Sequence, residues 1–146
     1  MQQLFQLYKS MFSAEPSACT PLTGSASNRK YYRLSGVAGA CIGVVGVDAL
    51  ENKAFLTIAR HFHGRGINVP KILAVSEDGS AYLQEDLGDV ILFDMLTAAG
   101  KSGEGMDKVE ELLCKTMAML PKIQFEGARG LDFQSAIRSR RSTDAW

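Results

Sequence analysis

A run of small residues followed by two basic ones is the segment of this chain best suited to bind an anion. Small side chains let main-chain amides approach an anion closely, hydroxyl groups add donors, and adjacent cations can neutralise phosphate charge. The run has a single glycine and no Gly-Lys-Ser/Thr, so it is neither a P-loop nor a G-x-G-x-x-G fingerprint. It predicts a phosphate-binding turn, with a plain hairpin turn as the alternative. Its residues are Gly24, Ser25, Ala26, Ser27, Asn28, Arg29 and Lys30.

A second segment has the pattern of a hinge that follows a β-hairpin. Two short apolar runs, residues 72–75 and 81–84, flank the pair Asp78-Gly79, which supplies the positive φ of a tight turn between paired strands. An acidic, glycine-ended stretch follows, and beyond it the hydrophobic period becomes helical. Main-chain groups of such a linker are suited to bind a nucleotide base, although an ordinary surface hairpin explains the pattern as well. The candidate base-contacting residues are Gln84, Glu85, Asp86 and Leu87.

Few other side chains have types and spacings that indicate chemistry. Glu51 lies in the first turn of a predicted helix, where dipole complementarity explains it and a phosphate-positioning role is the alternative. His61 and His63 are two residues apart on that helix, so they point in different directions and cannot share a metal. Acidic residues around the hinge look like a metal cluster in one dimension, but hinge solvation explains them equally; they are Glu85, Asp86 and Asp89. We predict no catalytic residue and no metal ligand in this chain.

Hydrophobic periodicity predicts the elements that must position these residues. The expected order is helix, strand, strand, strand, helix, hairpin, hinge, helix, helix. The clearest helix spans residues 48–64, with Asp48 as its cap and glycines at its end. Its expected apolar stripe is Leu50, Ala54, Phe55, Ile58, Ala59 and Phe62. The other helices are predicted over residues 1–12, 91–100 and 107–123, and the first three strands over 19–24, 31–35 and 40–47.

Strand geometry and proline geometry predict two further features of these elements. Alternation along the second strand places Tyr31 and Arg33 on one face of the sheet, and Tyr32 and Leu34 on the other. Pro121 is expected to kink or end the last helix.

Length, charge and cysteine content limit the class of protein. The 146 residues suffice for one domain with a real core. Lys+Arg and Asp+Glu are balanced at 16 each, which argues against general nucleic-acid binding. The three cysteines are widely spaced and odd in number, so a reducing cytoplasm fits best. Residues 1–12 lack the pattern of a signal peptide, and no stretch approaches the length of a membrane span.

Taken in this order, the motifs resemble the small lobe of the aminoglycoside phosphotransferase and choline kinase-like superfamily. The nearest branch looks like the bacterial kinases of N-acetylmuramate and N-acetylglucosamine. The resemblance covers residues 21–123 and depends on four segments together, residues 22–34, 51–55, 69–73 and 82–88.

The resemblance implies an α+β fold. Residues 1–88 would form a protein-kinase-like small lobe, a five-stranded antiparallel sheet with a crossing helix. Residues 89–146 would hold the hinge and the first helices of a larger lobe. The turn at residues 24–27 would cover the phosphates of ATP, and residues 84–87 would bracket the adenine.

The sequence departs from the kinase pattern in two places. A lysine on the third strand usually reaches the phosphates and pairs with a helix glutamate, but residues 40–47 contain none. Arg29 or Lys30 could take its place, or phosphate binding could differ in this branch. The aspartate base and the metal-binding asparagine and aspartate of the family lie past residue 146. We therefore expect this chain to be the amino-terminal portion of an ATP-dependent phosphotransferase, inactive by itself.

The resemblance also implies a cofactor and partners. Mg²⁺ is expected for the complete enzyme, as is an acceptor with a sugar or aminoglycoside-like hydroxyl. An alternative from another class is a non-catalytic nucleotide-binding or interaction module. An apolar stripe on the last helix would belong inside the larger lobe, so this chain is expected to self-associate through it; the stripe contains Val109, Leu112, Leu113, Leu120 and Ile123.

Overall fold

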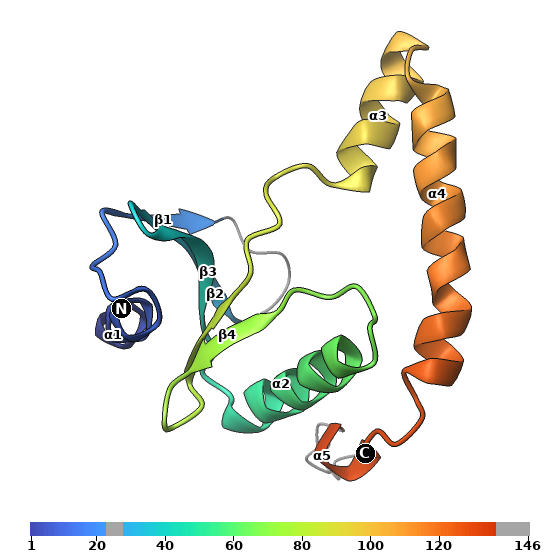
Figure 1. Cartoon of the computed structure of the whole chain (residues 1–146). Coiled ribbons are helices and arrows are strands. Elements are labelled where there is room, and N and C mark those ends of the chain that lie inside the picture. Colours follow the sequence, from blue (N-terminus) through green and yellow to red (C-terminus); the bar gives the residue numbers. More distant parts are fainter. Residues whose placement is uncertain (23–27, 137–146) are drawn as a thin grey trace, which may run out of the picture. The chain divides into compact units, whose positions relative to one another are not determined.

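The structure, a computed structural model, describes residues 1–22 and 28–136. The predicted phosphate-binding turn at residues 24–27 and the predicted frayed tail at 138–146 lie outside the described residues. The chain forms two compact units, Met1–Asp86 with Leu131–Trp146, and Leu87–Gly130. The fold is α+β, as predicted (Figure 1). The predicted domains, residues 1–88 and 89–146, stay a prediction.

A five-stranded antiparallel sheet forms the centre of the first unit, which confirms the predicted sheet. The strand order is β1-β2-β3-β5-β4, and every neighbouring pair is antiparallel. The hairpin strands have the predicted bounds, and Gly79 in their turn has a φ of 69°. The strands are β1 (Ala18–Leu22), β2 (Lys30–Gly36), β3 (Gly39–Val45), β4 (Ile72–Val75) and β5 (Ala81–Gln84).

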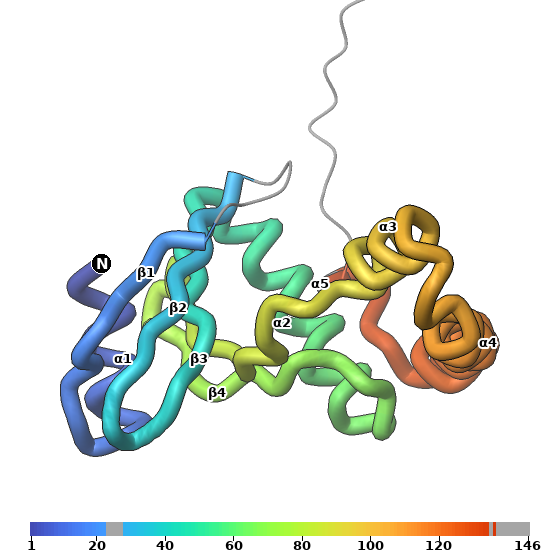
Figure 2. The backbone as a smooth tube through the Cα atoms, turned by 90° about the horizontal axis from the view of Figure 1, so that it is seen from above, coloured from blue at the N-terminus to red at the C-terminus, as the bar shows by residue number. Residues whose placement is uncertain are grey.

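The helices α1 (Gln2–Phe12) and α2 (Ala49–Gly64) lie on opposite faces of this sheet (Figures 1 and 2). The short helix α5 (Phe133–Ala136) contacts α2. The predicted cap of α2 is confirmed, because a carboxylate oxygen of Asp48 accepts hydrogen bonds from the main-chain amides of Leu50 and Glu51, at 3.0 and 3.1 Å. These bonds fix where α2 begins.

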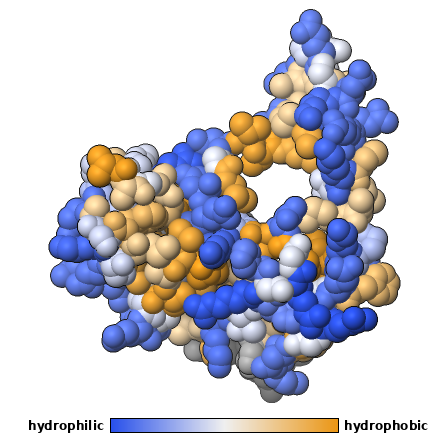
Figure 3. Space-filling model, viewed as in Figure 1, coloured by the Kyte–Doolittle hydropathy of each residue, from blue (hydrophilic) through white to orange (hydrophobic). Residues whose placement is uncertain are grey.

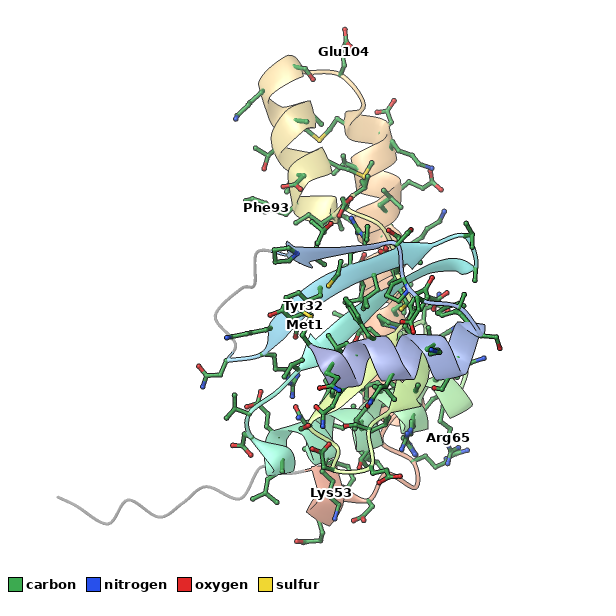
Figure 4. All side chains as sticks on the ribbon, turned by 90° about the vertical axis from the view of Figure 1, so that its left-hand side faces the viewer. Met1, Tyr32, Lys53, Arg65, Phe93 and Glu104 are labelled. Atoms are coloured by element: carbon green, nitrogen blue, oxygen red, sulfur yellow. The ribbon has the colours of Figure 1, made fainter. Side chains whose placement is uncertain are left out.

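Each face of the sheet has its own apolar core. α1 lies across one face of the sheet (Figure 4). Its residues Leu4 and Tyr8 are completely buried there, and the Tyr8 hydroxyl donates to the carbonyl oxygen of Gly39 at 2.7 Å. Leu56 of α2 packs on the other face, against Tyr82. The predicted sides of the second strand are confirmed, because Tyr32 packs with the α1 cluster and Tyr31 with the α2 cluster. The buried sheet residues are Leu34, Cys41, Ala81 and Leu83 on the α1 side, and Ile42, Val44 and Tyr82 on the α2 side.

The predicted apolar stripe of α2 is wrong in one member. Leu50 is 60% exposed, whereas Asn52 is completely buried. The side that faces the sheet runs through residues 52, 56 and 59, and Leu50 is two residues from Asn52, about 200° around the helix. The Asn52 amide nitrogen donates to the carbonyl oxygens of Gly46 and Gly79, both at 3.1 Å. A polar residue therefore ties α2 to β3 and to the hairpin turn.

The second unit consists of α3 (Leu92–Ser102), α4 (Met106–Pro121) and the π-helical turn η1 (Lys122–Glu126). The predicted end of the last helix at Pro121 is confirmed. Ala99 and Val109 are buried within this unit. Hydrophobic surface surrounds the start of α3 (Figure 3), and α4 exposes Leu113, Met117 and Leu120. The self-association expected from the α4 stripe stays a prediction.

In the part of the chain that the structure describes, no helix is both long enough and apolar enough to cross a membrane.

Gly46 should not tolerate a side chain, because a Cβ atom there would lie 2.1 Å from the Asn52 amide oxygen. We expect Gly46→Ala to lower the free energy of unfolding by about 1–3 kcal/mol, since overpacking forces such contacts apart. Urea unfolding followed by far-ultraviolet circular dichroism measures this. Gly64→Ala is the matched control, because its Cβ meets no atom within 4 Å, and it should stabilise the chain by up to about 1 kcal/mol. Equal effects of the two substitutions would contradict the close contact.

Candidate functional site

Two rows of side chains cross the sheet on the face that α2 covers. Antiparallel pairing sets Tyr31 of β2, Val44 of β3 and Tyr82 of β5 in one row. The second row contains Arg33, Ile42 and Gln84 on the same three strands. Paired residues in a sheet project to the same side, so the polar groups of both rows belong to one surface. The candidate site is built on this surface.

Arg29, just before β2, is held against the first turn of α2. Its Nη2 atom donates to the main-chain oxygen of Glu51 at 3.1 Å and lies 3.3 Å from Glu51 Oε1. Its guanidinium carbon is 4.7 Å from the centre of the Phe55 ring, within the range of a cation–π contact. Only 11% of the Arg29 side chain is exposed. A buried, permanently charged group is thus fixed just before β2, against the start of α2.

Tyr82 lies next to this ion pair and is completely buried. Its ring stacks on Phe55 with 5.5 Å between centroids and 26° between planes. Burial raises the pKa of the phenol far above its ordinary value; the Arg29 cation opposes this rise, and Tyr31 and Glu51 add to it. The hydroxyl oxygen has no hydrogen-bond partner among residues 1–22 and 28–136. Tyr82 is therefore a neutral, buried phenol at physiological pH.

The second candidate cation, Lys30, lies on the other side of the sheet. It is exposed and pairs with Val45, which packs with the α1 cluster. The alternation of side chains along β2 places Tyr31 on the α2 side and Lys30 opposite it. The structure therefore brings Arg29, and not Lys30, to Glu51.

The segment after β5 is tied back to the sheet. The Glu85 amide donates to the Lys71 carbonyl oxygen at 2.9 Å, and the Lys71 amide donates to Glu85 Oε2 at 3.3 Å. Asp86 accepts two hydrogen bonds from Arg33, from Nε at 2.6 Å and from Nη2 at 3.1 Å. The side chains of Arg33 and Asp86 are 25% and 15% exposed. The predicted hinge thus begins with two residues in fixed positions.

The other predicted site residues are placed as follows. Leu87 is exposed and is the first residue of the second unit. Gly24, Ser25, Ala26 and Ser27 lie outside the described residues. Among the residues that the structure does describe, no three His, Cys, Asp or Glu side chains are grouped to hold a metal ion. Glu51, the candidate phosphate-positioning acid, pairs with Arg29, and Asp86, a candidate base-contacting residue, pairs with Arg33.

Sequence reasoning missed Arg33 and Phe55 as parts of this site. The sequence places Arg33 on the face of Tyr31 without giving it a role, and it indicates only packing for Phe55, a member of the apolar stripe of α2. The signal for Arg33 was its place on a strand between apolar neighbours, where a charge needs a partner. Its partner is 53 residues away in the sequence, so no local pattern could identify it.

No protein-family model matches this chain, and no curated protein matches it. The kinase-like resemblance therefore stays a prediction from the sequence motifs.

Tyr82→Phe should be neutral or stabilising by up to about 1 kcal/mol, because the buried hydroxyl has no partner among the described residues. Tyr8→Phe is the matched control and should cost about 1 kcal/mol, since it removes the bond to Gly39. Burial holds the pKa of Tyr82 above that of the unfolded chain, so stability should fall as the pH rises past about 10. Urea unfolding measured across alkaline pH should show a smaller fall in Tyr82→Phe. An unchanged fall would contradict this assignment.

The pair Arg33–Asp86 should contribute more to stability than an exposed pair. A double-mutant cycle with Arg33→Ala and Asp86→Ala should give a coupling energy of about 2 kcal/mol, because the pair is largely buried and doubly hydrogen-bonded. The control is Lys9–Glu15, whose side chains are 64% and 58% exposed; its coupling should be below about 1 kcal/mol. Urea unfolding measures both cycles. Indistinguishable coupling energies would mean that the Arg33–Asp86 pair does not stabilise the position of the segment after β5.

Proposed function

We propose that the first unit binds ATP as the small lobe of a phosphotransferase, one whose acceptor is a sugar or aminoglycoside-like hydroxyl. In this proposal residues 24–27 contact the phosphates and the base lies beside residues 84–87. Three structural features support the arrangement: the five-stranded antiparallel sheet, a helix that carries an acid on one face, and a linker directly after β5.

The ion pair between Arg29 and Glu51 is the observation that carries the proposal. Kinase-like small lobes use a cation, paired with a glutamate on a helix, to contact the phosphates of ATP. In the usual arrangement that cation is a lysine on the third strand, and β3 of this chain has none. Here Arg29, the residue just before β2, pairs with the helix glutamate Glu51. A guanidinium has five donors, so one group can bind an acid and a phosphate together.

The connection between β1 and β2 contains both the cation and the small residues of this proposal. Leu22 and Tyr31 are paired across the two strands, so the intervening segment begins and ends at the same end of the sheet. Arg29 belongs to that segment and is bound to Glu51. Small residues in the same connection would let main-chain amides approach the phosphates closely. The cation and the small-residue turn thus belong to the same connection in the chain.

The described residues do not fit a Mg²⁺ site. Glu51 is bound to Arg29 and Asp86 to Arg33, and no other group of acids is assembled in the described part of the chain. We therefore assign no metal-dependent step to these residues. The proposal for this chain is nucleotide binding, and phosphoryl transfer belongs to the complete protein.

Arg29→Met should weaken ATP binding at least about tenfold, which corresponds to about 1.4 kcal/mol, while the affinity for adenosine should change little. The reason is that Arg29 is proposed to contact phosphate and not the base. Titrations followed by amide NMR shifts measure both affinities, and they should place the largest shifts near residues 28–33 and 84–86.

Arg60→Met is the matched control, because Arg60 is an exposed arginine on the same helix as Glu51, and it should bind ATP like the unaltered chain. The NMR spectrum of each free variant checks that the fold is intact. Shifts confined to regions away from both segments, or equal ATP affinity in Arg29→Met, would overturn the proposed site.

A further inference from the structure

Gln84, the last residue of β5, has a buried amide oxygen that lacks a hydrogen-bond partner within residues 1–22 and 28–136. A buried acceptor without a donor costs free energy, and most such groups in folded proteins are paired. The main chain around Gln84 is ordered in the sheet, where it pairs with Ile42 and Ile72. The side-chain oxygen therefore lies buried at the end of β5 with its hydrogen bond unmade.

Arg33, the cation in the same row of side chains, does not donate a hydrogen bond to Gln84 Oε1. Arg33 lies in the same row of side chains, separated from Gln84 by Ile42. Its Nε and Nη2 atoms donate to Asp86, two residues beyond Gln84. Each oxygen of the Asp86 carboxylate accepts one of these two hydrogen bonds. Gln84 Oε1 is consequently the acceptor of this row that still requires an N–H group.

We propose that Gln84 Oε1 accepts a hydrogen bond from the exocyclic amino group of the base, so that this chain selects 6-aminopurine nucleotides over 6-oxopurine nucleotides. This inference depends on the proposed function, which places the base beside residues 84–87. Adenine carries a donor at position 6, whereas hypoxanthine and guanine carry an acceptor there. An acceptor opposite Gln84 Oε1 would leave both oxygens unpaired and repelling each other. Sites that hydrogen-bond one substrate group discriminate strongly against analogues that lack it.

The side chain, and not only the main chain of the hinge, would then determine base specificity. Asp86 is the other acceptor near the base and could bind the N1–H and 2-amino groups of guanine. Its two hydrogen bonds from Arg33 reduce its capacity for this. The two residues therefore act in the same direction, one by accepting from adenine and the other by being occupied.

The test compares the dissociation constants of ATP, ITP and purine riboside triphosphate for the unaltered chain. These ligands share the triphosphate and ribose and differ at position 6, where they carry an amino group, an oxo group or hydrogen. We expect ATP to bind at least about tenfold more tightly than either analogue. Equal affinities, or tighter binding of ITP, would overturn the inference, and this comparison requires no variant.

A second comparison assigns the preference to Gln84. Gln84→Met removes the acceptor at similar size, and it should bring the ATP-to-ITP affinity ratio close to one, mainly by weakening ATP binding. Gln6→Met is the control, because Gln6 is an exposed glutamine of α1, and it should keep the full ratio. An unchanged ratio in Gln84→Met would overturn the assignment even if the unaltered chain prefers ATP.

The outcome also separates this inference from the proposed function. If ATP and ITP bind equally and both lose affinity in Arg29→Met, the nucleotide site stands and the role of Gln84 is wrong. If no triphosphate binds, both proposals are wrong.

Discussion

The register of β3 between its two neighbours is the constraint on which the first unit depends. Ile42 and Val44 face α2 because they pair with Arg33 and Tyr31 on one side and with Gln84 and Tyr82 on the other. A shift of β3 by one residue would move Ile42 and Val44 to the α1 face. The register therefore decides at once which residues form the two cores and which can form a site.

Close packing of α1 helps to hold that register. A Cβ atom at Gly43 of β3 would lie 2.5 Å from Leu34 and 3.0 Å from Leu4. Glycine at this position lets α1 approach the sheet, and a shifted strand would present a larger residue to the helix. On the opposite face, Asn52 makes the comparable connection from α2 to the end of β3. Both helices are thus matched to one alignment of the central strand.

Two arginines form ion pairs on the α2 face of the sheet. Arg33 belongs to β2, and Arg29 lies just before β2. Arg29 binds Glu51 at the start of α2, and Arg33 binds Asp86 in the segment that follows β5. The first pair joins the connection before β2 to α2, and the second joins β2 to the segment after β5. Arg29 belongs to the connection proposed to contact the phosphates, and Asp86 to the segment proposed to contact the base. Because the side chains are largely buried, these contacts are screened by solvent less than surface ion pairs are.

The sequence by itself determined the elements and their faces. The hairpin followed from period-two alternation around Asp78-Gly79, the α2 cap from Asp48, and the sides of Tyr31 and Tyr32 from strand geometry. These features depend on neighbours within a few residues, so composition and spacing contain the necessary information. The candidate segments at residues 24–30 and 84–87 were also visible locally.

The partners of the charged and polar side chains were decided by the tertiary structure alone. The sequence left open whether Arg29 or Lys30 replaces the missing lysine, and the pairing of Arg29 with Glu51 across 22 residues favours Arg29. It indicated neither the bond from Arg33 to Asp86 nor the burial of Asn52 and of Gln84 Oε1. Each depends on strands and helices that are distant in the chain meeting at one point. Hydrophobic patterning specifies which face is buried, but a hydrogen bond needs two particular atoms within about 3 Å, and only the assembled sheet brings them together.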